Sequence, residues 1–379
     1  MTGRRALVLD ADSRTALAAV RALGRAGFEV GTMTTFGEAL ASHSRYAIRH
    51  HVPAPGRALG ASIDALAEEH GYEVALAAKE FTLAALLEHP PRIPTVPTLG
   101  RPLVLLSDKL ELAGIAERAG VRYPATGVAG RDEAASYPLM VKSSRSAIVG
   151  ADGTVVDWSG AKIARDASEL EGIAARIRTK GLTPIFQPRV ERMDKVNVTV
   201  VRRDGECEVR FPYRVLRDVP LTGGIAVSLE TLPAAEGIGR DAVDALDLVC
   251  AVAGYDGVAN GEFCVARDGS LTLIEVNTRL WGSLWFAERL GQRVTERCVR
   301  LALGLPRLPD APLAGRSRYH NVAGELRWAR LHPTPVRRTA EVLASLRPWH
   351  VFEYVDVRDL GALGWVGVGK ARALRRRGR

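Results

Sequence analysis

The chain has 379 residues, of which 47% are hydrophobic, 25% charged and 6% aromatic, and its formal net charge is +9. This composition is typical of a soluble globular protein, and it excludes a disordered chain and a membrane-embedded one. The length predicts two or three packed domains, since one domain usually takes roughly 100–200 residues.

The first part of the chain alternates between predicted strands and helices. Strands are expected over 6–12, 28–35 and 72–80, and helices over 13–27, 63–71 and 81–89. This order predicts a βαβ unit within an α/β domain over residues 1–105, with its end marked by the proline-rich segment HPPRIPTVPTLGRP. The first strand-to-helix turn, DADSRTA, contains no glycine, so dinucleotide binding is disfavoured.

The middle of the chain predicts helices first and an antiparallel region after them. A helix over 107–120 is expected to have Ser107 as its N-cap and Asp108 in its first turn. The sequence then predicts, in order, the strand LMVKS, a helix over 166–181, the strand TPIFQPRV, strand-like runs to about residue 232 and a long helix over 234–254. The successive strand-like runs indicate an antiparallel sheet.

The last part of the chain, from residue 327, is expected to be an extension. It begins near the proline-rich break HPTP and continues with a helix and the strand-like WHVFEYVDV. The final ten residues, KARALRRRGR, hold six lysines and arginines and no acid, which leaves about +3 for the rest of the chain. We favour a solvated basic end over a tail that binds RNA or an acidic partner, because no aromatic residues are interleaved with the basic ones.

Four cysteines are spread along the chain without CxxC or Cys/His spacing, so neither a disulfide framework nor a zinc site is indicated. The N-terminal stretch lacks the apolar core of a signal peptide, and no apolar run approaches the roughly 20 residues of a membrane span. We therefore expect a cytoplasmic protein with no membrane partner.

Polar side chains interrupt an apolar strand in the predicted hairpin over 257–277, which turns at an Asp-Gly dipeptide. Side chains alternate along a strand, so Glu275, Asn277 and Arg279 should share one face while Ile274 and Val276 pack on the other. Glu262, on the preceding strand, is expected to lie beside Glu275. Two carboxylates and a carboxamide oxygen suit Mg²⁺, with Mn²⁺ as the alternative ion. The competing interpretation is that these residues cap loops or pair with surface arginines.

At these residues the sequence resembles the ATP-grasp superfamily, and within it the subgroup of carbamoyl-phosphate synthetase and biotin carboxylase. The resemblance rests on the order of "SDK", "LMVKS", "IFQPRV" and "GEF…LIEVNTRLWGS" along nearly the whole chain. It implies an α/β (α+β) fold in which a Rossmann-like preATP-grasp domain, residues 1–105, precedes a two-part ATP-grasp fold with antiparallel sheets. The two parts would be a small lid, 106–190, and a large subdomain, 191–326, followed by the C-terminal extension, 327–379.

The resemblance also implies roles for individual residues. Glu262, Glu275 and Asn277 would bind the metal, and Lys109 and Lys142 would contact ATP phosphates, although both could be surface lysines. Gln187 would lie at the adenine and Asp194 at the ribose. Arg279, Arg217 and Arg214 would stabilise charge during the reaction, and the Gly223–Gly224 pair would form either an anion-binding turn or an ordinary β-turn.

One segment departs from the family pattern. After the strand lysine the family usually has a glycine-rich flap, whereas this chain has Ser143, Ser144, Arg145 and Ser146. Their hydroxyl and guanidinium groups could contact the phosphates in place of glycine amides. The departure also raises the chance that catalysis is altered or lost.

The resemblance implies an ATP-dependent carboxylate–amine ligase. Its partners would be a small carboxylic acid and an amine, its cofactors ATP and Mg²⁺, and a homodimer is left open. Two alternatives remain: a nucleotide-binding protein without ligase activity, and an RNA-associated protein that uses the basic tail. Trp281, Trp285 and Phe286 either line the substrate pocket or pack along a helix face.

Overall fold

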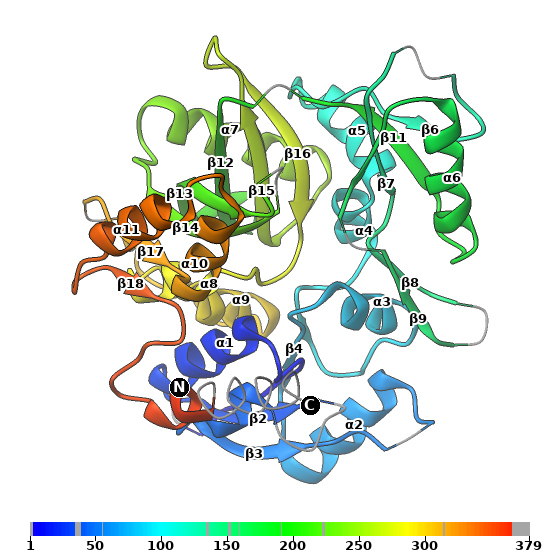
Figure 1. Ribbon diagram of the computed structural model, residues 1–379. Coiled ribbons are helices and arrows are strands. Elements are labelled where there is room, and N and C mark those ends of the chain that lie inside the picture. Colours follow the sequence, from blue (N-terminus) through cyan, green and yellow to red (C-terminus); the bar gives the residue numbers. More distant parts are fainter. Residues whose placement is uncertain are drawn as a thin grey trace, which may run out of the picture.

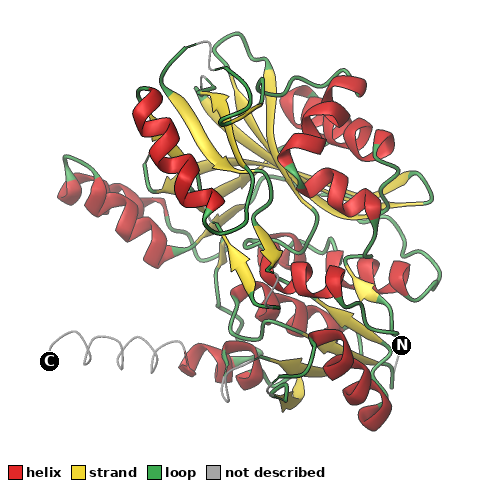
Figure 2. Ribbon diagram, turned by 90° about the vertical axis from the view of Figure 1, so that its right-hand side faces the viewer, coloured by secondary structure: helices red, strands yellow, loops and turns green. Residues whose placement is uncertain are grey.

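The computed structural model describes residues 3–34, 39–54, 56–133, 136–150, 153–158, 160–190, 192–221, 224–313 and 315–365. Its architecture is α/β with three sheets of five, four and seven strands and a small two-stranded hairpin. The N-terminal sheet and its helices form the lower part of the molecule in both views, and the other two sheets form the upper part (Figures 1 and 2). The predicted basic tail, residues 370–379, lies outside the described residues.

The N-terminal sheet is parallel throughout and has the order β3-β2-β1-β4-β5. Its strands are β1 (Arg5–Val8), β2 (Glu29–Met33), β3 (Ala47–His51), β4 (Val74–Leu76) and β5 (Thr95–Val96), and its helices are α1 (Arg14–Arg25), η1 (Leu40–His43), α2 (Leu59–His70) and α3 (Glu80–Glu88). The buried side chains of α1 pack on one face, and those of α2 and α3 pack on the other. The predicted βαβ unit is thereby confirmed, with Ser13 Oγ capping α1 through Ala16 N.

The four-stranded sheet is antiparallel and has the order β10-β7-β11-β6. With its one covering helix it makes the unit that we call the lid, after the prediction from the sequence. Its elements are β6 (Gly127–Val128), β7 (Leu139–Ser143), β10 (Lys162–Ala164), β11 (Pro184–Pro188) and α6 (Ala167–Arg178). Val141 of β7 and Ile173 of α6 belong to its core. The hairpin of β8 (Ala147–Val149) and β9 (Val155–Asp157) leaves this lid and contacts α3 of the N-terminal domain (Figure 1).

The seven-stranded sheet has the order β16-β15-β12-β13-β14-β17-β18. Its strands are β12 (Asp194–Arg203), β13 (Glu206–Val219), β14 (Ile225–Thr231), β15 (Gly257–Val265), β16 (Leu271–Asn277), β17 (Arg318–His320) and β18 (Val351–Phe352). The accompanying helices are α4 (Arg101–Ser107), α5 (Lys109–Arg118), α7 (Gly237–Val252), α8 (Leu284–Arg289), α9 (Val294–Ala302), α10 (Val322–Leu331) and α11 (Pro335–Ser345). Helices α4, α5 and α7 share one core with this sheet, whereas α8 and α9 join α1 in the core on its other face.

Two local predictions were wrong. Asp108, not Ser107, caps the helix after residue 107: its carboxylate accepts from Leu110 N, while Ser107 ends α4 and donates to Leu103 O. The segment WHVFEYVDV forms only the two-residue strand β18, because Tyr354 has a φ of 65° that turns the chain. None of the described helices is both long and apolar enough to cross a membrane.

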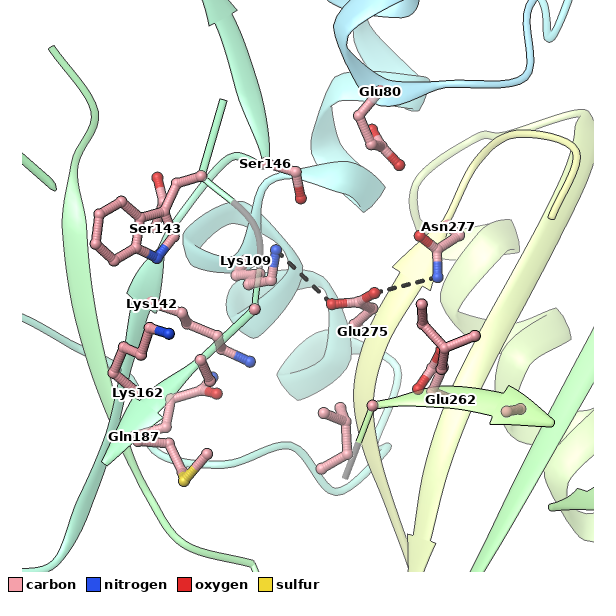
Figure 3. Close-up of a pocket in the computed structure, with 18 of the residues that line it drawn as sticks. Glu80, Lys109, Lys142, Ser143, Ser146, Lys162, Gln187, Glu262, Glu275 and Asn277 are labelled. Atoms are coloured by element: carbon pink, nitrogen blue, oxygen red, sulfur yellow. Dashed lines mark hydrogen bonds and ion pairs between the residues drawn. The ribbon is translucent and has the colours of Figure 1, made fainter. Parts of the chain in front are cut away.

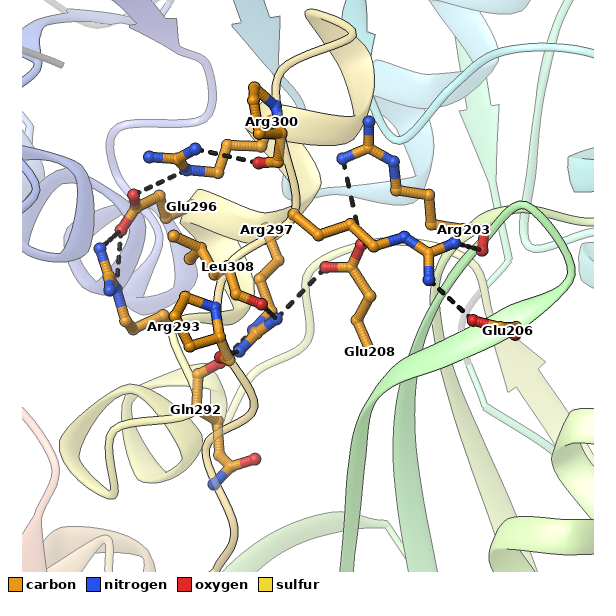
Figure 4. Close-up of polar contacts among 12 residues, drawn as sticks. Arg203, Glu206, Glu208, Gln292, Arg293, Glu296, Arg297, Arg300 and Leu308 are labelled. Carbon is orange, nitrogen blue, oxygen red and sulfur yellow. Dashed lines mark hydrogen bonds and ion pairs between the residues drawn. The ribbon is translucent and has the colours of Figure 1, made fainter.

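A network of arginines and glutamates attaches the loop after α9 to β13 (Figure 4). Arg297 is 1% exposed and donates to the carbonyls of Gln292 and Leu308 and to Glu208 of β13, over 3.2–3.3 Å. Glu296 accepts from Arg300 at 3.0 Å. Each buried charge therefore has an opposite charge or a carbonyl beside it, which avoids the cost of an unpaired buried ion.

Glu288 of α8 predicts how stability depends on pH. Its Oε1 accepts from both N and Oγ1 of Thr295, yet burial raises the pKa of Glu288 from 4.5 to about 7. Between these values the folded state binds more protons than the unfolded one, so stability should fall as pH rises through that window. Glu288→Gln keeps the acceptor and removes the charge. At pH 8 we expect the variant to be more stable than the wild type by about 1–2 kcal/mol and to melt at a higher temperature. At pH 5 the two melting temperatures should be equal. A lower melting temperature at pH 8 would mean that the charge is stabilising.

Candidate active site

A cavity of about 1860 Å³ lies where the N-terminal domain, the lid and the large sheet meet. Its walls come from α1 and α3, from β7, β10 and β11, and from β12, β15 and β16 with the loop that follows β16. Eleven lysines and arginines line it against five aspartates and glutamates. The surplus of positive charge suits an anionic ligand.

Glu262 and Glu275 face each other across the β15–β16 hairpin, at directly paired positions. The Asp-Gly turn therefore sets the register that the sequence predicts, and Asn277 lies two pairs further along the same strand. Asn277 Nδ2 donates to Glu275 Oε1 at 3.2 Å, and all three side chains line the cavity (Figure 3). The structure thus brings the predicted metal-binding residues together.

The expected alternation fails at Ile274. A bulge opposite Glu262 and Phe263 leaves Ile274 without a cross-strand partner, and both Ile274 and Glu275 line the cavity. Val276 is 4% exposed and packs in the core as expected. The bulge adds an apolar side chain beside the carboxylates, which the simple two-residue period does not predict.

Lys109 and Lys142 lie across the cavity from the carboxylate pair, and both are at least nine-tenths buried. Lys109 Nζ is 3.9 Å from Glu275 Oε2 (Figure 3). Burial, followed by repulsion from Lys109, lowers the pKa of Lys142 to about 8. Burial raises the pKa of Glu275, but Lys109, Lys142, Asn277 and Lys195 together lower it more, so the net shift is downward. The lysines therefore form a buried positive wall opposite an ionised carboxylate.

Lys195 of β12 is a cavity residue that the sequence interpretation missed. Its Nζ is 2.5 Å from Glu262 Oε2, and the side chain is 12% exposed. Burial lowers the pKa of Lys195, but Glu262, with smaller contributions from Asp218 and Glu275, outweighs it and the net shift is upward. The available signal was its place on the strand paired with "GEF", directly opposite Cys264. Asn197, two residues on, also lines the cavity and is 4% exposed.

Ser143 and Gln187 line the lid side of the cavity, and each is 2% exposed. Gln187 Nε2 donates to Thr126 Oγ1 at 2.8 Å, which fixes the amide on β11. Ser143 Oγ has no hydrogen-bond partner among the described residues. A buried hydroxyl without a partner is costly, so this atom is suited to a ligand at the cavity wall.

Arg279 lies in the loop after β16 and still lines the cavity. Its Nε donates to Glu80 Oε1 at 2.7 Å, and Glu80 is the first residue of α3 in the N-terminal domain. The arginine therefore links the segment after β16 to the N-terminal domain. Lys79 and Arg14 of the same domain also line the cavity.

The structure does not bring Arg214, Arg217 or Asp194 to the cavity, contrary to the roles that the resemblance implied. Arg214 Nε pairs with Asp194 at 2.6 Å, and neither side chain lines the cavity. The reason is strand alternation: Tyr213 faces the cavity, so its neighbour Arg214 faces away. Arg217 follows a bulge in β13, pairs with the buried Glu325 of α10 and stacks on the Trp328 ring.

Only some of the remaining residues predicted to lie near the site line the cavity. Gly224 lines the cavity, whereas Gly223 lies outside the described residues. Trp281 is also part of the cavity wall. Trp285 and Phe286 are 4% and 0% exposed and belong to the core shared by α1 and α8, so helix packing accounts for them.

The donor set fits Mg²⁺ better than a transition metal. Among the described residues no three His, Cys, Asp or Glu side chains gather into a metal-binding group. On the β15–β16 hairpin, Glu262, Glu275 and Asn277 offer two carboxylates and one carboxamide, with Lys109 and Lys195 as their counter-charges. A hard ion that takes some oxygen ligands from protein and the rest from phosphates or water matches such a set.

No protein-family model matches the sequence, and no curated protein sequence matches it. Solved structures do match its fold. N5-carboxyaminoimidazole ribonucleotide synthetase in an ADP complex has 17% identity and a TM-score of 0.66, covering 87% of this chain and 85% of its own. L-amino acid ligase from Bacillus licheniformis has 14% identity and a TM-score of 0.65, with 84% and 79% covered. Biotin carboxylase from Campylobacter jejuni has 18% identity and a TM-score of 0.64, with 83% and 74% covered. These likenesses confirm the ATP-grasp fold that the sequence resemblance implied.

Proposed function

We propose that this ATP-grasp chain is an ATP-dependent carboxylate–amine ligase. The observation that carries the proposal is the pairing of Glu262 with Glu275 and Asn277 opposite Lys109 and Lys142 in one cavity. Solved proteins with this fold include an L-amino acid ligase and a biotin carboxylase bound to a nucleotide. In the proposed reaction the γ-phosphoryl group of ATP passes to a carboxylate, and an amine displaces phosphate from the acyl phosphate to give the amide, ADP and phosphate.

The chain's own residues would act by position and charge. Lys109 and Lys142 would hold the phosphates, and Gln187 and Ile274 would line the base end. Glu262, Glu275 and Asn277 would hold Mg²⁺, which when bound neutralises phosphate charge. Arg279, fixed by Glu80, would face the oxygens on which negative charge develops. No protein nucleophile is needed, because phosphoryl transfer depends mainly on positioning and electrostatics.

A nucleotide-binding protein without ligase activity is the second candidate. It is favoured by Ser143, Ser144, Arg145 and Ser146, which stand where the family has flap glycines. Ser143 and Ser144 are 2% and 5% exposed, so their side chains are enclosed instead of forming an open loop. If this candidate is right, the protein binds a nucleotide but does not turn it over with any acid.

A screen with hydroxylamine would test the ligase proposal. Hydroxylamine can replace an unknown amine and converts an acyl phosphate into a hydroxamate, so only the acid needs to be varied. We expect Mg²⁺-dependent ADP formation and hydroxamate of matching mass with at least one small acid. ADP that forms without acid, or no ADP with any acid, would contradict the ligase proposal.

Cys264 offers a measure of nucleotide binding that does not depend on turnover. It lines the cavity and is partly exposed, whereas Cys207, Cys250 and Cys298 are buried. Burial raises the pKa of the Cys264 thiol, so its alkylation should be slow at pH 7 and faster toward pH 9. We expect Mg·ADP to slow maleimide labelling of Cys264 at least tenfold, measured by peptide mass spectrometry. The control is Cys264→Ser, which should remove the rapidly labelled site. Equal labelling with and without nucleotide would contradict both candidates.

A further inference from the structure

Arg14 is the first residue of α1 and lies on the cavity wall. Its side chain is 23% exposed and lies against the backbone of Gly282 in the loop after β16. A Cβ on Gly282 would come within 2.5 Å of Arg14 Nη2, so the guanidinium fits there only because residue 282 is glycine. The same contact region includes Thr15, whose Oγ1 donates to Trp281 O at 3.3 Å.

Two residues outside the cavity hold this guanidinium. Arg14 Nη1 donates to Glu353 Oε1 at 2.5 Å, and Tyr319 OH donates to the same oxygen at 2.7 Å. Glu353 follows β18 in the C-terminal part of the chain, is 8% exposed and does not line the cavity. The carboxylate of Glu353 therefore holds Arg14 on the side away from the cavity, and the side of the guanidinium that faces the cavity remains open to a ligand.

Several hydrogen-bond donors at this wall are unused. Within the described part of the chain, Nε and Nη2 of Arg14 donate to no acceptor, and the backbone N–H groups of Arg14 and Thr15 begin α1 without an intrahelical partner. Trp281, which is 4% exposed and lines the same cavity, has an indole N–H with no partner among the described residues. Donors without acceptors at a helix N-terminus favour a bound anion.

The charge of the cavity leads to the same conclusion. The lining residues carry a surplus of six positive charges. A nucleoside triphosphate carries fewer negative charges than this surplus, and a bound divalent cation lowers that number further. The other cavity cations near the N-terminal domain have acids beside them, since Lys79 pairs with Asp12 and Arg279 with Glu80. Arg14 is paired with Glu353, which lies outside the lining, so its charge is not neutralised by an acid on the cavity wall.

We propose that Arg14 is a specificity-determining residue that binds a second anionic group, a carboxylate or a phosphate, on the acid substrate. Glu353 and Tyr319 act as positioning residues that hold its guanidinium over Gly282. This inference rests on the proposed function, because it assigns the reacting carboxylate to the metal and Arg279 and the second anion to Arg14. The substrate class is therefore an acid that carries one further negative group.

Binding and turnover can be measured separately. With Mg·ADP bound, the protein is titrated calorimetrically with succinate, inorganic phosphate and acetate. Hydroxamate formation then compares acids that differ by one anionic group, butyrate with succinate and glycerate with 3-phosphoglycerate. We expect the wild type to prefer the dianionic member of at least one pair tenfold or more in kcat/KM. Succinate and phosphate distinguish a second carboxylate from a phosphate.

Arg14→Met should reduce that preference at least tenfold, through KM and not kcat, and Arg14→Lys should retain part of it. Glu353→Gln, which keeps the acceptor and loses the charge, should raise KM for the dianionic acid by about threefold to tenfold with kcat unchanged. The double variant Arg14→Met/Glu353→Met leaves no unpaired buried carboxylate and should show the same loss as Arg14→Met. Arg25→Met is the matched control, since Arg25 lies on α1, pairs with Asp356 and does not line the cavity.

The outcomes separate the two proposals. Unchanged preference in Arg14→Met while acids are ligated would overturn the subsite and leave the ligase standing. Anion binding that depends on Arg14, together with no turnover of any acid, would overturn the ligase and leave the anion site standing. No binding of succinate or phosphate to the wild type and no preference in turnover would overturn the subsite.

Discussion

Glu275→Gln should lower ATP turnover at least 1000-fold, roughly the effect of removing a group that stabilises charge directly at the reacting centre. The variant keeps the shape of the side chain but removes one of the two carboxylates that face each other at the hairpin. Without it the cavity loses a hard, negatively charged ligand, and Lys109 and Lys142 lose their counter-charge. ADP formation measured with the acid identified by the hydroxylamine screen would check this expectation.

The matched control is Glu230→Gln on β14. Glu230 pairs with Arg318 at 2.8 Å on the same sheet but does not line the cavity, so its turnover should be within about twofold of the wild type. Both variants should keep the wild-type circular dichroism spectrum. Full activity in Glu275→Gln would show that the chemistry does not use this hairpin.

Arg21→Met should destabilise the fold by about 3–5 kcal/mol, because it removes one partner from a buried ion network. Arg21 is 1% exposed; its Nε donates to Asp359 Oδ2 at 2.7 Å, and its guanidinium stacks on Trp285. Asp359, which is fully buried, ties the C-terminal segment to α1 and also accepts from Ser44 Oγ. Guanidinium denaturation of the full chain would measure the loss.

Arg25→Met provides the comparison on the same helix. The side chain of Arg25 is 26% exposed and pairs with Asp356. In Arg25→Met the Nε of Arg21 would still lie 3.9 Å from Oδ2 of Asp356, so the loss of stability should be about 1 kcal/mol. Adding Asp359→Asn to Arg21→Met removes the unpaired charge and should recover part of the stability. Equal stability of Arg21→Met and the wild type would mean that this network does not hold the C-terminal segment in place.

The sequence was sufficient where the signal is local. The helix after DADS, the Asp-Gly hairpin and the pairing of Glu262 with Glu275 follow from periodicity, capping and turn chemistry over a few residues. Local signals failed at three positions, and two of them show the reason. Two candidate caps stood side by side at Ser107 and Asp108, and a bulge turned Ile274 toward the cavity. Neither outcome can be read from a regular period, since both depend on how the neighbouring strand and helix are placed.

The sequence by itself thus determined the ATP-grasp resemblance and the residues that share the hairpin face: Glu262, Glu275 and Asn277. The tertiary structure decided which other charges reach the cavity. Lys195 and Arg214 both project from strands of one sheet, yet Lys195 faces Glu262 while Arg214 faces Asp194 outside. Alternation places side chains on two faces but does not say which face meets the lid and the N-terminal domain. Arg14 and Glu353, 339 positions apart, meet only because the C-terminal segment packs against α1, a long-range contact that no local pattern encodes.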